Sequence, residues 1–80
     1  MSDPLTPPAR WPGIDGDTVS CREKLRTLSE NHEELVQVLR DAFEDAVLMG
    51  VDEGALRQIL HGVVDALPSP RRAGATRDAA

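Results

Sequence analysis

The sequence predicts an all-α fold: a two-helix antiparallel hairpin, with a long first helix and a short second one, that completes a helical bundle by oligomerisation. Three observations predict it. Apolar residues recur every three or four positions over residues 20–67, prolines and glycines gather toward both ends, and a glycine divides the periodic stretch near residue 50. The 80 residues contain one cysteine and no paired Cys/His spacing, so neither an intrachain disulfide nor a zinc ion supplements the small core.

Both ends of the chain are predicted to be disordered. Residues 1–16 hold four prolines and two glycines and show no hydrophobic period, so residues 1–17 are predicted to form a mobile, Pro-rich arm. Pro68 and Pro70 end the last helix, and residues 68–80 are predicted to form a disordered tail. The helical hairpin therefore occupies residues 18–67.

The long helix is predicted over residues 20–49. Ser20 and Glu23 fit a capping box, although a start at Asp17 is an alternative. A heptad pattern follows, in which seven of eight a and d positions are apolar: Leu25, Leu28, His32, Leu35, Leu39, Ala42, Ala46 and Met49. A break at Asn31, with Glu34 in the first turn of a fresh helix, is the alternative that the unbroken heptad disfavours.

A tight turn over Gly50–Asp52 is predicted to join the two helices. Gly50 suits the left-handed position that ends a helix, and Asp52 suits the N-cap of the next one. Val51 and Leu56 have the spacing of a hydrophobic staple. The short helix then spans residues 53–67.

The unequal helix lengths predict that another chain participates. A helix of 30 residues is about 45 Å long and one of 15 residues about 22 Å, so the short helix covers only the second half of the long one. The first half keeps a thin apolar seam of the coiled-coil type, and the short helix is apolar on more of its circumference than one neighbour covers. A homodimeric four-helix bundle satisfies both, whereas the alternative is a loose monomer with a frayed first half.

The charge distribution excludes several classes of function. Residues 1–67 carry a net charge of −7 and only the tail is basic, with a net charge of +2, which gives the chain its net charge of −5, so general nucleic-acid binding is disfavoured. No apolar run reaches the roughly 20 residues that cross a bilayer. The amino end has no basic and apolar signal pattern, so a cytoplasmic protein without a membrane partner is expected.

Neither catalysis, a metal nor a cofactor is predicted. His32 is read as a polar interruption of the seam, and His61 as a rim residue paired with Asp65. Cys21 lies near a helix start, where its pKa would fall, but no base accompanies it in the sequence. A reduced, partly buried thiol is favoured over a reactive one or a disulfide with a second copy.

The predicted function is that of a non-enzymatic protein–protein interaction module, a self-associating hairpin that serves as a small adaptor or regulatory subunit. Trp11 is expected to anchor in a partner's groove together with Ile14, or else to fold back over its own bundle. The alternative function is an acidic inhibitor that sequesters a nucleic-acid-binding protein. The predicted partner-binding residues, in full, are Trp11, Ile14, Leu25, Leu28, Glu30, His32, Glu33 and Glu34.

Overall fold

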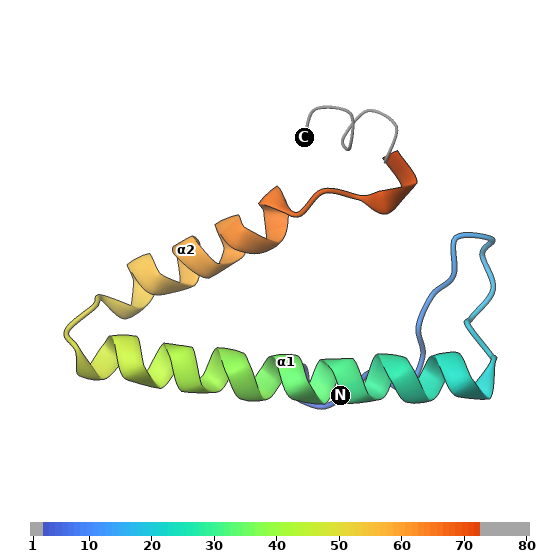
Figure 1. Cartoon of the computed structure of the whole chain (residues 1–80), viewed down its shortest axis with the longest axis horizontal. Coiled ribbons are helices and arrows are strands. Elements are labelled where there is room, and N and C mark those ends of the chain that lie inside the picture. Colours follow the sequence, from blue (N-terminus) through green and yellow to red (C-terminus); the bar gives the residue numbers. More distant parts are fainter. Residues whose placement is uncertain (1–2, 73–80) are drawn as a thin grey trace. The chain divides into compact units, whose positions relative to one another are not determined.

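The computed structural model describes residues 3–72, in which the regular structure is helical (Figure 1). Helix α1 spans Arg22–Leu48, helix α2 spans Glu53–Ala66, and a 3-10 turn, η1, spans Pro70–Arg72. No strand occurs between residues 3 and 72, where the one β-type pairing is an isolated bridge from Pro12 to Thr18. The all-α prediction is therefore confirmed.

The chain forms two compact units, Met1–Asp45 and Ala46–Ala80. The first contains the amino-terminal arm and most of α1, and the second contains the end of α1, the interhelical turn, α2 and η1. The antiparallel hairpin and its oligomerisation stay predictions.

Helix α1 is continuous through Asn31, so the alternative of two separate helices is wrong. Its first turn starts one residue later than the predicted capping box requires. The carbonyl of Cys21 accepts a hydrogen bond from the backbone N–H of Leu25 at 2.9 Å, which places Cys21, and not Ser20, at the N-cap. A helix start is set by a single hydrogen bond, and either of the two adjacent residues Ser20 and Cys21 could supply the accepting carbonyl.

The turn after α1 adopts the geometry that its glycine predicts. Gly50 has φ of +98°, in the left-handed region. Its N–H donates to the carbonyl of Val47, and the N–H of Val51 donates to the carbonyl of Ala46, both at 3.0 Å. This pair of bonds is the Schellman motif, which satisfies carbonyls that the end of a helix leaves unpaired.

Helix α2 begins with the predicted N-cap. The Oδ2 atom of Asp52 accepts from the backbone N–H of Ala55 at 2.9 Å, while the Asp52 carbonyl accepts from Leu56. The helix ends at Ala66, and Leu67 is its C-cap, directly before Pro68. Neither described helix has the length and apolar character needed to cross a bilayer.

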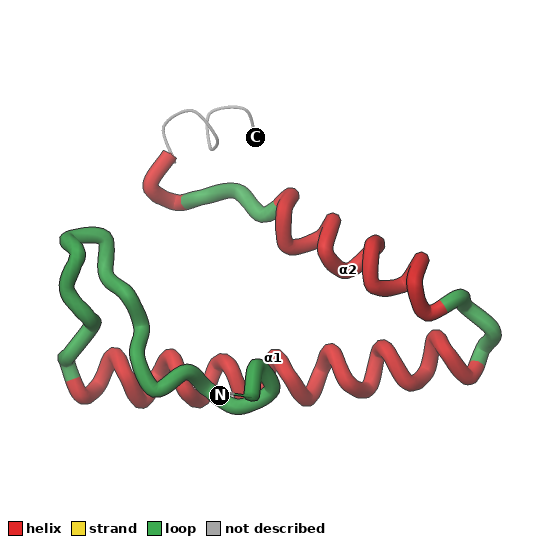
Figure 2. Tube along the Cα trace, turned by 180° about the vertical axis from the view of Figure 1, so that it is seen from behind, coloured by secondary structure: helices red, strands yellow, loops and turns green. Residues whose placement is uncertain are grey.

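The disorder of the arm and of the tail stays a prediction. Residues 73–80, which make up most of the predicted tail, lie outside the residues that the structure describes. The described part of the arm contains hydrogen-bonded turns. Asp3 caps one of them, since its Oδ1 accepts from Leu5 N–H at 2.9 Å and its carbonyl accepts from Thr6 N–H at 2.9 Å. Figure 2 shows this arm as a tube that turns back beside the first half of α1.

Candidate functional site

Residues 11–19 form a closed loop just before α1. The carbonyl of Trp11 accepts from the N–H of Val19 at 2.8 Å, and the carbonyl of Asp17 accepts from the N–H of Gly13 at 2.7 Å. A Cβ atom at Gly13 would lie 2.7 Å from the Asp17 carbonyl oxygen, closer than real Cβ contacts allow. Only glycine therefore permits this closure, and we refer to residues 11–19 as the arm loop.

The arm loop contacts α1 through an aromatic pair. The rings of Trp11 and His32 are edge to face, with centroids 6.3 Å apart and planes at 77°. Such pairs stabilise a contact by about 0.5–1.5 kcal/mol beyond the area that they bury. Of the two arrangements expected for Trp11, the structure has the one in which it turns back onto its own chain.

The seam beneath the arm loop is half-buried. Leu25, Leu28 and His32, which we call the N-terminal seam, all have intermediate exposure. Within residues 3–72, Nδ1 of His32 is buried and has no hydrogen-bond partner.

The structure separates the predicted partner-binding residues into three groups. Trp11 contacts His32, and Leu25 and Leu28 share the intermediate exposure of these two residues. Ile14 lies at the tip of the arm loop and is 79% exposed, so it does not share the environment of Trp11. Glu30, Glu33 and Glu34 are exposed on α1.

Cys21 is exposed at the amino end of α1. Hydrogen bonds from the backbone amides of Lys24 and Glu23 lower the pKa of its thiol, and the Lys24 charge adds to them. His32 is eleven residues further along the same helix, which is about 16 Å by helical rise, too far for a Cys–His pair. The expectation of a partly buried thiol is therefore wrong, because the N-cap position turns the side chain to the surface.

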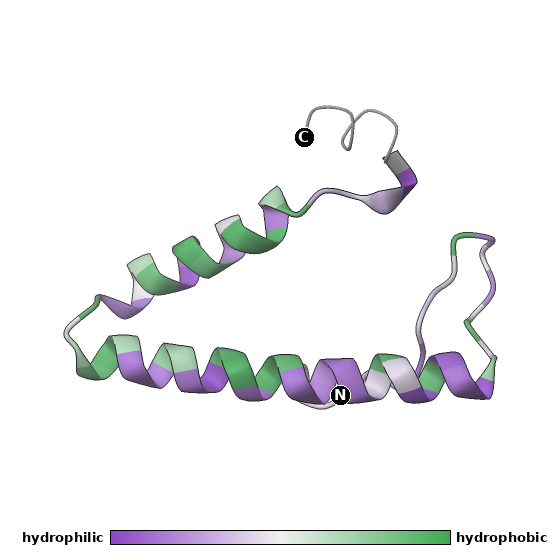
Figure 3. Ribbon diagram, in the orientation of Figure 1, coloured by the Kyte–Doolittle hydropathy of each residue, from purple (hydrophilic) through white to green (hydrophobic). Residues whose placement is uncertain are grey.

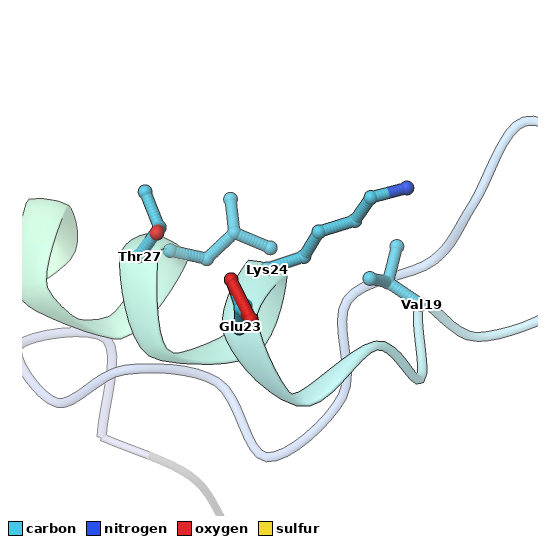
Figure 4. A pocket seen from close by; sticks show the side chains of 5 residues that line it. Val19, Glu23, Lys24 and Thr27 are labelled. Atoms are coloured by element: carbon cyan, nitrogen blue, oxygen red, sulfur yellow. The ribbon is translucent and has the colours of Figure 1, made fainter.

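A shallow, open depression lies beside this helix start (Figure 4). It is lined by Val19, Glu23, Lys24, Thr27 and Leu28, and its surface is mostly apolar. Its openness leaves a bound molecule in contact with water, which does not suit the desolvated chemistry of an active site. Among residues 3–72 no group of three or more His, Cys, Asp or Glu residues is placed to hold a metal ion.

A set of exposed apolar side chains lies on α2 and at its C-cap, outside the predicted site. Figure 3 shows apolar residues repeating along this helix. Ile59, Val63, Val64 and Leu67 are 59%, 56%, 65% and 65% exposed, and we call these four residues the α2 face. Leu56, at 8% exposure, is the one buried residue among those whose side chains are described.

The α2 face was missed although its signal was present in the sequence. These residues recur at spacings of four, one and three, which places them within about 140° around one helix. The sequence predicts that the short helix is apolar on more of its circumference than one neighbour covers, but none of these four residues is among the predicted partner-binding residues. Comparisons with protein-family models, with curated proteins and with solved structures give no match.

Proposed function

We propose that this chain is a non-enzymatic protein–protein interaction module. In this proposal α1 and α2 fold antiparallel through the Gly50–Asp52 turn, and a second copy covers the apolar surface that each copy leaves open. The resulting bundle serves as a small adaptor or regulatory subunit of a larger assembly.

The α2 face is the observation that carries the proposal. Four large apolar side chains, three of them in the 14-residue helix α2 and one at its C-cap, are each more than half exposed and lie within one arc. Soluble monomers scatter such residues singly, and contiguous apolar patches mark interaction sites. The arc is too wide for a two-stranded coiled-coil seam and suits packing against more than one helix.

Helix α1 offers a second open surface. Beyond the N-terminal seam, the same heptad pattern continues with Leu35, Leu39 and Ala42, all exposed, and Val38 lies beside them at 64% exposure. Leu56 is the one buried side chain among those that the structure describes, so this small chain gains most from association that removes such residues from water.

Substitution of Val63 tests this function. Val63→Asp places a carboxylate in the α2 face, and burial of an unpaired charge at an interface opposes association strongly. We expect the wild-type chain to remain a dimer or larger species across a dilution series to low micromolar concentration, and the variant to be monomeric. Light scattering measures the mass.

Gln58→Asp is the matched control, because it adds the same charge about 140° around the same helix and at an exposed position. This variant should keep the wild-type mass. A monomeric wild-type chain, or equal masses for both variants, contradicts self-association through the α2 face.

A second candidate function is the acidic inhibitor of a nucleic-acid-binding protein. It is favoured by the exposure of all six acidic side chains in the middle and end of α1: Glu30, Glu33, Glu34, Asp41, Glu44 and Asp45. The Oδ1 atom of Asp41 accepts a hydrogen bond from Nε2 of Gln37 at 3.1 Å. An exposed row of carboxylates complements a basic protein surface.

A further inference from the structure

The exposure of the heptad residues rises along α1, and reaches 56% at Leu35 and 38% at Leu39. Leu25, Leu28 and His32 are half-buried, whereas Leu35, Leu39 and Ala42, the next members of the same pattern, are exposed. The arm loop accounts for the change, because its contact with α1 is at His32. The half-buried and the exposed residues thus belong to one continuous stripe of α1 over residues 25–42, which we call the α1 stripe.

The arm loop covers this part of α1 with few side chains. Trp11 supplies the aromatic contact, and Val19 is half-buried near Leu28, whereas Ile14 points away from the stripe at 79% exposure. A helix laid along the stripe would present an apolar residue at every a and d position except that of His32, and would therefore bury more of it than the loop does.

From this geometry we infer that the α1 stripe has two alternative occupants, the chain's own arm loop and a helix of a second copy. The arm loop thereby limits self-association, and its release extends the dimer contact from Leu35 back to Leu25. This inference rests on the proposed self-association and assigns to it a regulatory segment.

A second copy is the occupant that the pattern favours. The open members of the stripe continue the covered ones in the same heptad register, and a heptad repeat is complementary to another helix carrying the same repeat. Two-fold symmetry pairs each stripe with its equivalent, so one pattern supplies both sides of the contact.

Removal of Trp11 tests the inference. Trp11→Ala should strengthen self-association about five- to 150-fold, the factor that corresponds to one aromatic pair in each of the two copies. The dissociation constant is measured on the full chain by sedimentation over a dilution series. Ile14→Ala is the control from the same loop and should leave the constant unchanged, because its side chain is exposed.

Gly13→Ala provides a second variant that keeps Trp11. The added Cβ would clash with the Asp17 carbonyl and open the loop, so self-association should strengthen as it does for Trp11→Ala. The emission of Trp11, the one tryptophan of the chain, should shift to longer wavelength as its ring leaves His32.

Each remaining outcome counts against the inference. If the wild-type chain associates and both variants associate equally or more weakly, the arm loop does not limit self-association. That result overturns the inference and leaves the proposed function standing. Monomers for all chains at every concentration overturn both. A loss of helical circular dichroism in both variants also overturns the cover, because a displaceable loop is not needed to hold α1 together.

Discussion

The structure lowers the pKa of the Cys21 thiol. Backbone amides of Lys24 and Glu23 stabilise its thiolate and lower its pKa, as expected for an N-cap position at the positive end of a helix. The thiolate should therefore form at lower pH in the folded chain than in the chain unfolded by denaturant. The pH dependence of alkylation by iodoacetamide measures the difference.

Two substitutions of Lys24 separate the causes of this shift. Lys24→Gln removes the charge, which is the smaller effect, and should leave most of the shift in place. Lys24→Pro removes the amide donor within the first helical turn, where proline is tolerated, and should raise the pKa toward its ordinary value. Since the folded pKa is the lower one, this interaction stabilises the fold above the ordinary thiol pKa and is lost as pH falls through the folded value.

Single side chains divide into those that the sequence predicts and those that it does not. Asp52 and Gly50 were predicted because each satisfies a local hydrogen-bonding need within four residues. The cap of α1 was assigned one residue too early, since Ser20 is the commoner N-cap type. The contact of Trp11 with His32 joins residues 21 positions apart, and the path of the arm between them has no periodic signal.

The end of α1 depends on a conformation that favours glycine. Gly50→Ala forces a Cβ into φ of +98°, and we expect it to lower the free energy of unfolding by about 1 kcal/mol. Gly62→Ala is the opposite case, since this glycine lies inside α2 with open space around its missing Cβ. It should raise helicity and stability by about 0.5–1 kcal/mol.

Denaturant titrations followed by circular dichroism measure both glycine variants. Both variants make the same Gly→Ala change. They differ in backbone conformation, since Gly50 has a positive φ and Gly62 lies inside a helix. A gain of stability in Gly50→Ala would contradict the Schellman geometry at the end of α1.

Helices were predictable because their signals are local and repeated. The prediction placed them at 20–49 and 53–67, against Arg22–Leu48 and Glu53–Ala66 in the structure. Burial was less predictable. Val63 and Leu67 have the spacing of core residues, and the sequence does not distinguish a face that packs inside its own chain from one that remains exposed.

Self-association brings together two copies of the chain that carry the same net charge and therefore repel one another. Each copy carries a net charge of −5, with acidic residues along much of α1, so two copies repel one another at low ionic strength. The apolar faces supply the attraction, which depends little on screening. The two candidate functions therefore predict opposite responses to sodium chloride.

An increase in ionic strength from about 0.02 M to about 0.5 M shortens the Debye length from about 20 Å to about 4 Å and so screens the repulsion between copies. We expect the dissociation constant for self-association to fall severalfold over this range, as measured by sedimentation. An acidic inhibitor instead loses affinity for a purified basic DNA-binding domain as salt rises, and loses it again when Glu30, Glu33 and Glu34 are replaced by glutamine. Self-association that weakens with salt would mean that opposite charges, and not apolar faces, hold the copies together.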